Sequence, residues 1–139
     1  MKKVFIGAGH GGADSGAVAR DKQLEKDLNL SIAKACGAYL ERHGVQVGYS
    51  RTRDEDDPVV QEVAECNRFA PDLAVDIHNN AGGGDGAEVY HAQRGGTGAS
   101  LAVNILAEIT KLGQRSSAWH GWECRNHHNV EENIKTWKP

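Results

Sequence analysis

A chain of 139 residues with a formal net charge of −3 has room for one ordinary domain and lacks the basic surface typical of nucleic-acid-binding proteins. Hydrophobic residues make up 39% and charged residues 25%, as in a soluble globular protein. No apolar run approaches the length of a membrane span, and the run after Lys2 and Lys3 is too short for a signal peptide. We therefore expect neither nucleic acid nor a membrane as a partner. Three cysteines without paired spacing argue against a disulfide framework and favour synthesis in a reducing compartment.

The first predicted element is a buried strand at residues 2–7, which leads into a glycine-rich loop around a single imidazole. This loop, residues 7–16, holds five glycines and His10. Glycine permits turns that side chains with a β-carbon resist, and α/β proteins bind ligands where their parallel strands end. His10 is therefore a candidate ligand-binding residue.

A long helix is predicted next, over about residues 24–43, with Gly44 as its C-terminal stop. Glu25 lies in its first turn, where exposed amides and the helix dipole favour a carboxylate without any further role. We expect an apolar stripe of this helix to face the core: Leu28, Ile32, Ala35, Cys36, Tyr39 and Leu40. Cys36, like Cys66 in the next helix, is expected to be a small buried side chain.

Residues 45–49 alternate in polarity and predict a second strand. The acidic run at 54–57 lacks the spacing of an EF-hand, so a solvated loop is preferred to a calcium site. Asp57 and Pro58 predict the N-cap and first residue of a second helix, which continues to about residue 69.

A third buried strand is predicted at 73–77 and ends at His78; a fourth is predicted at 87–90, followed by a helix at 97–112. Strand and helix patterns alternate, which predicts an α/β fold: a mostly parallel twisted sheet with helices on both faces. Residues 1–139 are expected to form one catalytic domain. Its last part, 116–139, shows no clean period and is expected either to pack irregularly against the sheet or to be partly disordered.

His10 and His78 each follow a strand of the same predicted sheet, so both are expected at its carboxyl edge. With Glu25 they offer two imidazoles and a carboxylate, which is the ligand set of catalytic Zn²⁺ sites that keep a fourth position open for water. Asp14 and Asp76 are candidates to orient an imidazole through its second nitrogen; Asp76 shares a strand face with His78 because the two are two residues apart. A second metal site at the tail residues His120 and Cys124 is disfavoured, since zinc-finger spacing is absent.

Four segments, in order, resemble motifs of the zinc-dependent N-acetylmuramoyl-L-alanine amidases of the Amidase_3 family, found in cell-wall remodelling enzymes and phage endolysins. They are Gly9-His10-Gly11-Gly12 with Asp14 and Gly16, Glu25-Lys26-Asp27-Leu28-Asn29-Leu30, Ser50-Arg51-Thr52-Arg53, and Asp76-Ile77-His78-Asn79-Asn80-Ala81. The resemblance covers roughly residues 1–112. It implies zinc ligands at His10, Glu25 and His78 and cleavage of the amide between N-acetylmuramic acid and L-alanine. It also implies that Asn80 lies near the substrate and Glu88 near the metal site.

The chain departs from the family pattern at three places. Glu62 stands where the family often has arginine, and Asp76 replaces a usual serine. The family's catalytic glutamate, on a final strand, has no counterpart in 116–139. We expect either a sequence that is truncated or altered after about residue 115, or another carboxylate, such as Glu88 or Glu123, in the acid–base role. Zinc binding with weak or absent turnover is the resulting hypothesis.

Other functions remain open on the sequence alone. A catalytically silent peptidoglycan-binding module, another zinc peptidase on the same fold, and a scaffold with a structural zinc are the alternatives. Since no signal peptide or repeated wall-binding module is found, we expect a bare catalytic domain made in the cytoplasm. Such a domain would act on peptidoglycan after release, as a monomeric endolysin does, or be a fragment of a larger amidase.

Overall fold

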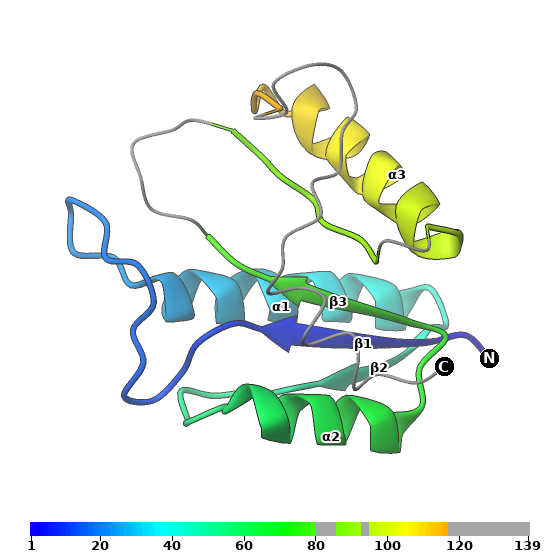
Figure 1. Cartoon of the computed structure of the whole chain (residues 1–139), viewed down its shortest axis with the longest axis horizontal. Coiled ribbons are helices and arrows are strands. Elements are labelled where there is room, and N and C mark those ends of the chain that lie inside the picture. Colours follow the sequence, from blue (N-terminus) through cyan, green and yellow to red (C-terminus); the bar gives the residue numbers. More distant parts are fainter. Residues whose placement is uncertain (80–85, 93–94, 117–139) are drawn as a thin grey trace. The chain divides into compact units, whose positions relative to one another are not determined.

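The computed structural model describes residues 1–79, 86–92 and 95–116. The chain divides into two compact units, Met1–Ala81 and Gly82–Lys138. The first contains β1 (Lys3–Ala8), α1 (Glu25–Arg42), β2 (Gln46–Tyr49), α2 (Val59–Phe69) and β3 (Leu73–Ile77), and the second contains α3 (Thr97–Lys111) (Figure 1). In the described parts of the chain, no helix combines the length and the apolar character needed to cross a membrane.

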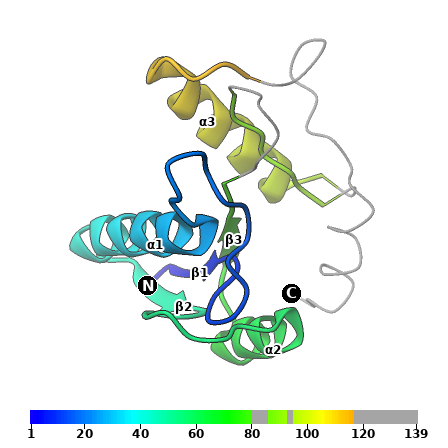
Figure 2. The same cartoon turned by 90° about the vertical axis from the view of Figure 1, so that its left-hand side faces the viewer.

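The three strands form a parallel sheet in the order β2-β1-β3. Parallel neighbours need a crossover connection, and here α1 links β1 to β2 while α2 links β2 to β3. The two helices lie on opposite faces of the sheet (Figure 2). The predicted α/β fold, with a parallel sheet and helices on both faces, is confirmed.

Side chains of β1 alternate between the two faces, as a strand requires. Ile6 and Ala8 are almost fully buried and pack with Ala33 of α1. Phe5 points to the other face, where its ring centroid lies 6.1 Å from that of Phe69 in α2. The central strand is therefore buried on both sides, which fixes the carboxyl end of β1 between the two helices.

The predicted core-facing stripe of α1 is wrong except at Leu40, which is partly buried and packs against the core. Leu28, Ile32 and Tyr39 are 36%, 45% and 57% exposed, and Cys36 is an exposed free thiol. The buried face instead carries residues four apart in the sequence: Glu25, Asn29, Ala33 and Gly37. Helical periodicity identifies two stripes of this helix, but the small side chains, which allow a close approach to the sheet, are the ones that face it. Cys66 is buried in α2, as predicted.

Three smaller predictions also need correction. Residues 87–90 form no strand: Ala87 makes an isolated parallel bridge to Ser116, with its N–H donating to the carbonyl of Arg115 at 2.7 Å. Helix α2 starts at Val59, so that Pro58, in an extended conformation, is its N-cap. Strand β3 is half-buried on one face only, because α2 packs over β1 and β2.

The remaining predictions about the C-terminal part have mixed outcomes. The helix predicted at 97–112 is confirmed as α3. The predicted tail, from Ser116 on, lies outside the described residues except for Ser116 itself, and so do Glu123 and the second metal site considered at His120 and Cys124.

Candidate metal centre

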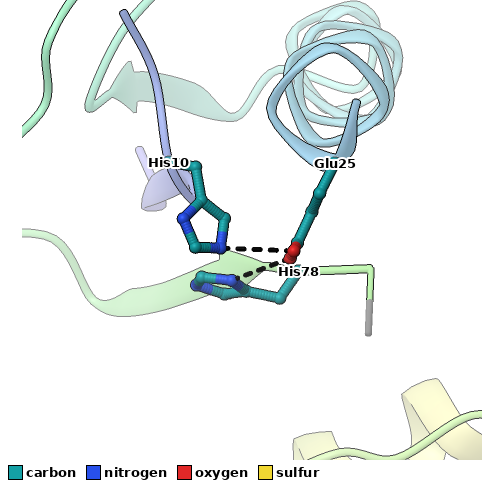
Figure 3. A group of neighbouring side chains, drawn as sticks. All are labelled: His10, Glu25 and His78. Atoms are coloured by element: carbon teal, nitrogen blue, oxygen red, sulfur yellow. Dashed lines mark hydrogen bonds and ion pairs between the residues drawn. The ribbon is translucent and has the colours of Figure 1, made fainter. Parts of the chain in front are cut away.

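Three predicted ligands converge at the carboxyl edge of the sheet (Figure 3). His10 follows β1, Glu25 is the first residue of α1, and His78 follows β3 directly. His10 Nε2 lies 3.3 Å from Glu25 Oε2, and His78 Nδ1 lies 3.2 Å from Glu25 Oε1. One ligand atom from each residue can be chosen so that all three lie within 4.8 Å of one another. The three side chains thus have the proximity that a shared metal ion requires.

The loop after β1 orients His10. The residue has a left-handed backbone, with φ of 64°, and its Nδ1 lies 2.8 Å from Asp14 Oδ2. This hydrogen bond lowers the pKa of the Asp14 carboxyl and turns Nε2 towards Glu25. Gly16 has φ of 60°, and a β-carbon there would lie 2.5 Å from His10 Cδ2 and 2.7 Å from Glu25 Oε2. Only glycine fits at this turn, because both the conformation and the space exclude a side chain.

Glu25 is a buried carboxylate whose oxygens are held by backbone amides. The N–H of Ala17 donates to Oε2 at 2.8 Å, and the N–H of Asn79 donates to Oε1 at 2.9 Å. Burial alone would raise the pKa of Glu25, but these two donors, together with His10 and Asn29, outweigh it and lower the pKa. The side chain is therefore ionised at neutral pH, as a metal ligand must be.

His78 is oriented from its other side by Asp76. Its Nε2 lies 3.0 Å from Asp76 Oδ2, so that Nδ1 is directed at Glu25. The Asp76 hydrogen bond is the largest cause that raises the pKa of His78 to about 9; burial acts in the opposite direction, and Glu25 adds to the rise. Both predicted orienting carboxylates, Asp14 and Asp76, are in place.

The donor set fits Zn²⁺. Two imidazole nitrogens and one carboxylate oxygen are ligands that zinc favours, and three protein ligands leave a position for water. Each histidine also has its second nitrogen next to a carboxylate, which is the usual support of metal-bound imidazole. These residues can hold a zinc ion that polarises a carbonyl and ionises water.

Sequence reasoning missed Asn29, which is fully buried behind the centre. Its Nδ2 donates to the carbonyl of Gly9 at 2.9 Å, and its Oδ1 accepts a hydrogen bond from Asn79 Nδ2 at 2.7 Å. Asn29 thus connects the chain before His10 to the chain after His78. Its position four residues after Glu25, on the same helix face, is the signal that could have identified it.

A second missed group holds the glycine-rich loop through the segment predicted to be solvated. Asp54 Oδ1 accepts the N–H of Gly12 at 2.9 Å, and Asp56 Oδ1 accepts the N–H of Ala13 at 2.9 Å. Lys26 Nζ donates to Asp54 Oδ2 at 2.7 Å and to the Gly12 carbonyl at 2.8 Å. The predicted solvated loop is confirmed, since Asp54 and Asp56 lie in an exposed loop, but the acidic run itself gives no sign of these hydrogen bonds to residues about 42 positions away.

Arg51 completes this support from a buried position. Its Nε donates to the carbonyl of Ala8 at 2.9 Å and its Nη2 to the carbonyl of Lys26 at 2.7 Å. The guanidinium therefore ties the end of β1 to the first turn of α1. The motif at residues 50–53 includes Arg51, but the sequence predicted no role for this side chain.

The other two predicted site residues are Glu88 and Asn80. Glu88 belongs to the second unit, where its Oε2 accepts a hydrogen bond from the Tyr90 hydroxyl. Asn80 lies outside the described residues.

Comparison with known proteins matches this chain to one family. The profile described as N-acetylmuramoyl-L-alanine amidase, Amidase_3, matches residues 4–133. The N-acetylmuramoyl-L-alanine amidase CwlM of Bacillus licheniformis is 44% identical over 92 residues, which are 65% of this chain and 36% of CwlM. The endolysin of Bacillus phage SPP1 is 40% identical over 91 residues, 64% of this chain and 33% of the endolysin.

Solved structures agree with the sequence match. The N-acetylmuramoyl-L-alanine amidase AmiC2 of Nostoc punctiforme superposes with a TM-score of 0.76 at 33% identity, over 84% of this chain and 66% of AmiC2. The aligned part spans about a third of the length of each of the two curated relatives named above. With a family profile that covers nearly all of its length, the chain belongs to the Amidase_3 family of N-acetylmuramoyl-L-alanine amidases.

Proposed function

We propose that this chain is a zinc-dependent hydrolase that cleaves the amide between N-acetylmuramic acid and L-alanine in peptidoglycan. The observation that carries the proposal is the convergence of His10, Glu25 and His78 in a chain of the amidase family. Two imidazoles and an ionised carboxylate are a donor set for zinc with an open position.

The proposed roles follow from the geometry of the side chains. His10 would bind zinc through Nε2, His78 through Nδ1, and Glu25 through a carboxylate oxygen, since these atoms face one another. When bound, zinc supplies Lewis-acid polarisation of the amide carbonyl and a water of pKa near ~7. Asp14 and Asp76 keep the rings turned so that the facing nitrogens stay available.

Amide cleavage also requires a proton for the leaving amine. We propose Glu88 as the group that transfers this proton; Glu123 is the alternative. The Glu88 carboxylate accepts a hydrogen bond from the Tyr90 hydroxyl. Asn80 is proposed to contact the substrate, on the strength of its place in the motif that contains His78.

The partner proposed for this chain is peptidoglycan. The relatives include amidases and a phage endolysin, which supports action on the cell wall after release from the cytoplasm. We propose that the chain acts there as a monomer.

The test is amide cleavage in purified peptidoglycan, scored as new amino termini of L-alanine. We expect release with zinc, loss of release after a chelator, and recovery when zinc is added back. His10→Ala should abolish release and zinc binding together, whereas Glu88→Gln should abolish release and leave zinc bound. Release that continues in the presence of chelator would contradict the proposed zinc dependence.

A catalytically silent peptidoglycan-binding domain is the second candidate. It is favoured by one observation: residues 116–139 contain no counterpart of the family's catalytic glutamate run. In that case, the protein would sediment with cell-wall sacculi and bind zinc, but no L-alanine amino termini would appear. The same assay therefore separates the two candidates.

A further inference from the structure

Asp76 lies between a predicted metal ligand and Glu62, a partly buried acid of α2. Its Oδ2 is 3.0 Å from His78 Nε2. Its Oδ1 lies beside Glu62 Oε1, because a β-carbon on Gly7 would collide with both of these oxygens. The two oxygens of Asp76 therefore have different neighbours: one is available to the imidazole and the other faces α2.

The hydrogen bond to Asp76 determines which nitrogen of His78 is available. A carboxylate can only accept, so the nitrogen that faces it, Nε2, must carry the proton. Since the pKa of His78 is about 9, the zinc-free ring also carries a proton on Nδ1 at neutral pH; a metal that binds Nδ1 displaces that proton, while Nε2 keeps its own. Nδ1 lies 3.2 Å from Glu25 Oε1, on the side of the metal centre.

We propose that Asp76 is a positioning residue, which holds His78 in the Nε2–H form with Nδ1 turned to the metal centre. The consequence of this positioning is tighter zinc binding, and this part of the inference rests on the proposed function. A hydrogen bond to a charged acceptor is roughly twice as strong as one between neutral groups, so a carboxylate orients the ring better than a hydroxyl would.

Glu62, a residue of α2, supports this arrangement from the side of the sheet that α2 covers. Burial, and then the neighbouring Asp76, raise the pKa of Glu62 to about 8, so its carboxyl is mainly protonated at neutral pH. A neutral acid beside Asp76 does not repel the Asp76 carboxylate. The absence of a side chain at Gly7 leaves room for both groups.

The experiment compares three variants of the full chain. Asp76→Ala removes the acceptor, and Asp76→Asn keeps an acceptor oxygen without the charge. Asp72→Asn is the matched control: it removes a carboxylate four residues earlier, where the side chain contacts Lys3 and Lys2 and no histidine. Zinc affinity is measured by competition with a chromophoric chelator. The proton on His78 Nε2 is observed by NMR of ¹⁵N-histidine-labelled protein, with and without zinc, and assigned with His78→Asn.

We expect Asp76→Ala to weaken zinc binding by about 10- to 100-fold, which is typical of the loss of a group that supports a metal ligand. Asp76→Asn should lose less than about tenfold, and Asp72→Asn should bind as the parent protein does. In the zinc-free parent, the Nε2 proton should be shifted downfield and exchange slowly, and Asp76→Ala should lose this signal. The partial rescue by asparagine distinguishes positioning from a general effect of negative charge.

Several results would overturn the inference. These are unchanged zinc affinity in Asp76→Ala, equal losses in Asp76→Asn and Asp76→Ala, or no protected Nε2 proton in the zinc-free parent. Because that proton is observed without metal, its presence tests Asp76 even if the parent protein binds no zinc. Failure of zinc binding or of amide cleavage in the parent would instead contradict the proposed function.

Discussion

Glu25 Oε1 lies 3.2 Å from His78 Nδ1, although 53 positions separate the two residues in the sequence. The same oxygen accepts the backbone N–H of Asn79 at 2.9 Å. The first turn of α1 is thereby joined to the chain that leaves β3. The candidate metal centre is thus built from contacts that also hold the fold together, and substitutions behind it should affect stability and zinc affinity together.

Asn29→Ala should destabilise the protein strongly. The side chain is fully buried and pairs with the carbonyl of Gly9 and the side-chain amide of Asn79; without it the amide would lose its acceptor and the carbonyl would keep the longer contact with Arg51 Nη2 at 3.4 Å. Buried polar groups left without a hydrogen bond cost about 1–3 kcal/mol each, so we expect the free energy of unfolding to fall by about 2–4 kcal/mol. Urea denaturation of the zinc-free protein measures this. Asn104→Ala, at an exposed position of α3, is the control; an equal loss there would argue against a special role for Asn29.

Arg51→Lys should be poorly tolerated even though it keeps the charge. The guanidinium donates to the carbonyls of Ala8 and Lys26 in different directions, which one ammonium group cannot reproduce. We expect a loss of about 2 kcal/mol or more in the free energy of unfolding, measured by thermal or urea denaturation. Arg53→Lys is the matched control: its side chain is 80% exposed and pairs with Glu55 at the surface, so it should change stability by less than about 0.5 kcal/mol. Similar losses in both variants would contradict the proposed role of the Arg51 guanidinium in tying β1 to α1.

Asp54→Ala should loosen the loop that carries His10. The carboxylate accepts the N–H of Gly12 and pairs with Lys26, so its removal leaves that amide without its side-chain acceptor. We expect the Gly12 amide to exchange with deuterium about five to ten times faster, which is the effect of losing one ordinary hydrogen bond. Glu55→Ala, in the same acidic run, should leave this rate unchanged. Slow exchange at Gly12 in both variants would show that the loop is held by other contacts.

Glu62→Gln should alter how stability depends on pH. The pKa of Glu62 is raised from 4.5 to about 8, by burial first and then by Asp76 and Asp57, with Glu65 adding to the rise and His78 opposing it. A folded-state pKa above the unfolded value contributes stability that is complete below pH 4.5 and is lost as pH rises through about 8. The glutamine variant lacks this loss. We therefore expect it to match the parent near pH 5 and to exceed it at pH 9 by at least about 1 kcal/mol.

The measurement is the difference between the unfolding free energies of the two zinc-free proteins across pH 5–9. Other titrating groups, His78 among them, occur in both proteins and cancel to first order in the difference. Glu65→Gln, one turn further along α2, is the control and should give a flat difference. A flat difference for Glu62→Gln as well would mean that its carboxyl ionises normally.

The sequence was sufficient to locate the elements that build the centre. The glycines around His10, the strands predicted at 2–7 and 73–77, and the helix predicted from about residue 24 are local patterns, and each lies within a residue or two of an element of the structure. Parallel strands bring their carboxyl ends to one edge, so two histidines that each follow a strand were expected to meet. That expectation required no knowledge of any long-range contact.

The tertiary structure alone decided the orientation of α1 and the groups that support the centre. The sheet-facing side of α1 is its stripe of small residues, Asn29 and Ala33 among them, because the distance between helix and sheet selects for size as well as for polarity. The roles of Arg51 and Asp54 depend on hydrogen bonds to backbone groups about 40 positions away, and a backbone amide carries no signature in the sequence. The sequence identifies the side chains that can bind a metal, but only the fold determines which backbone amides and carbonyls hold those side chains in place.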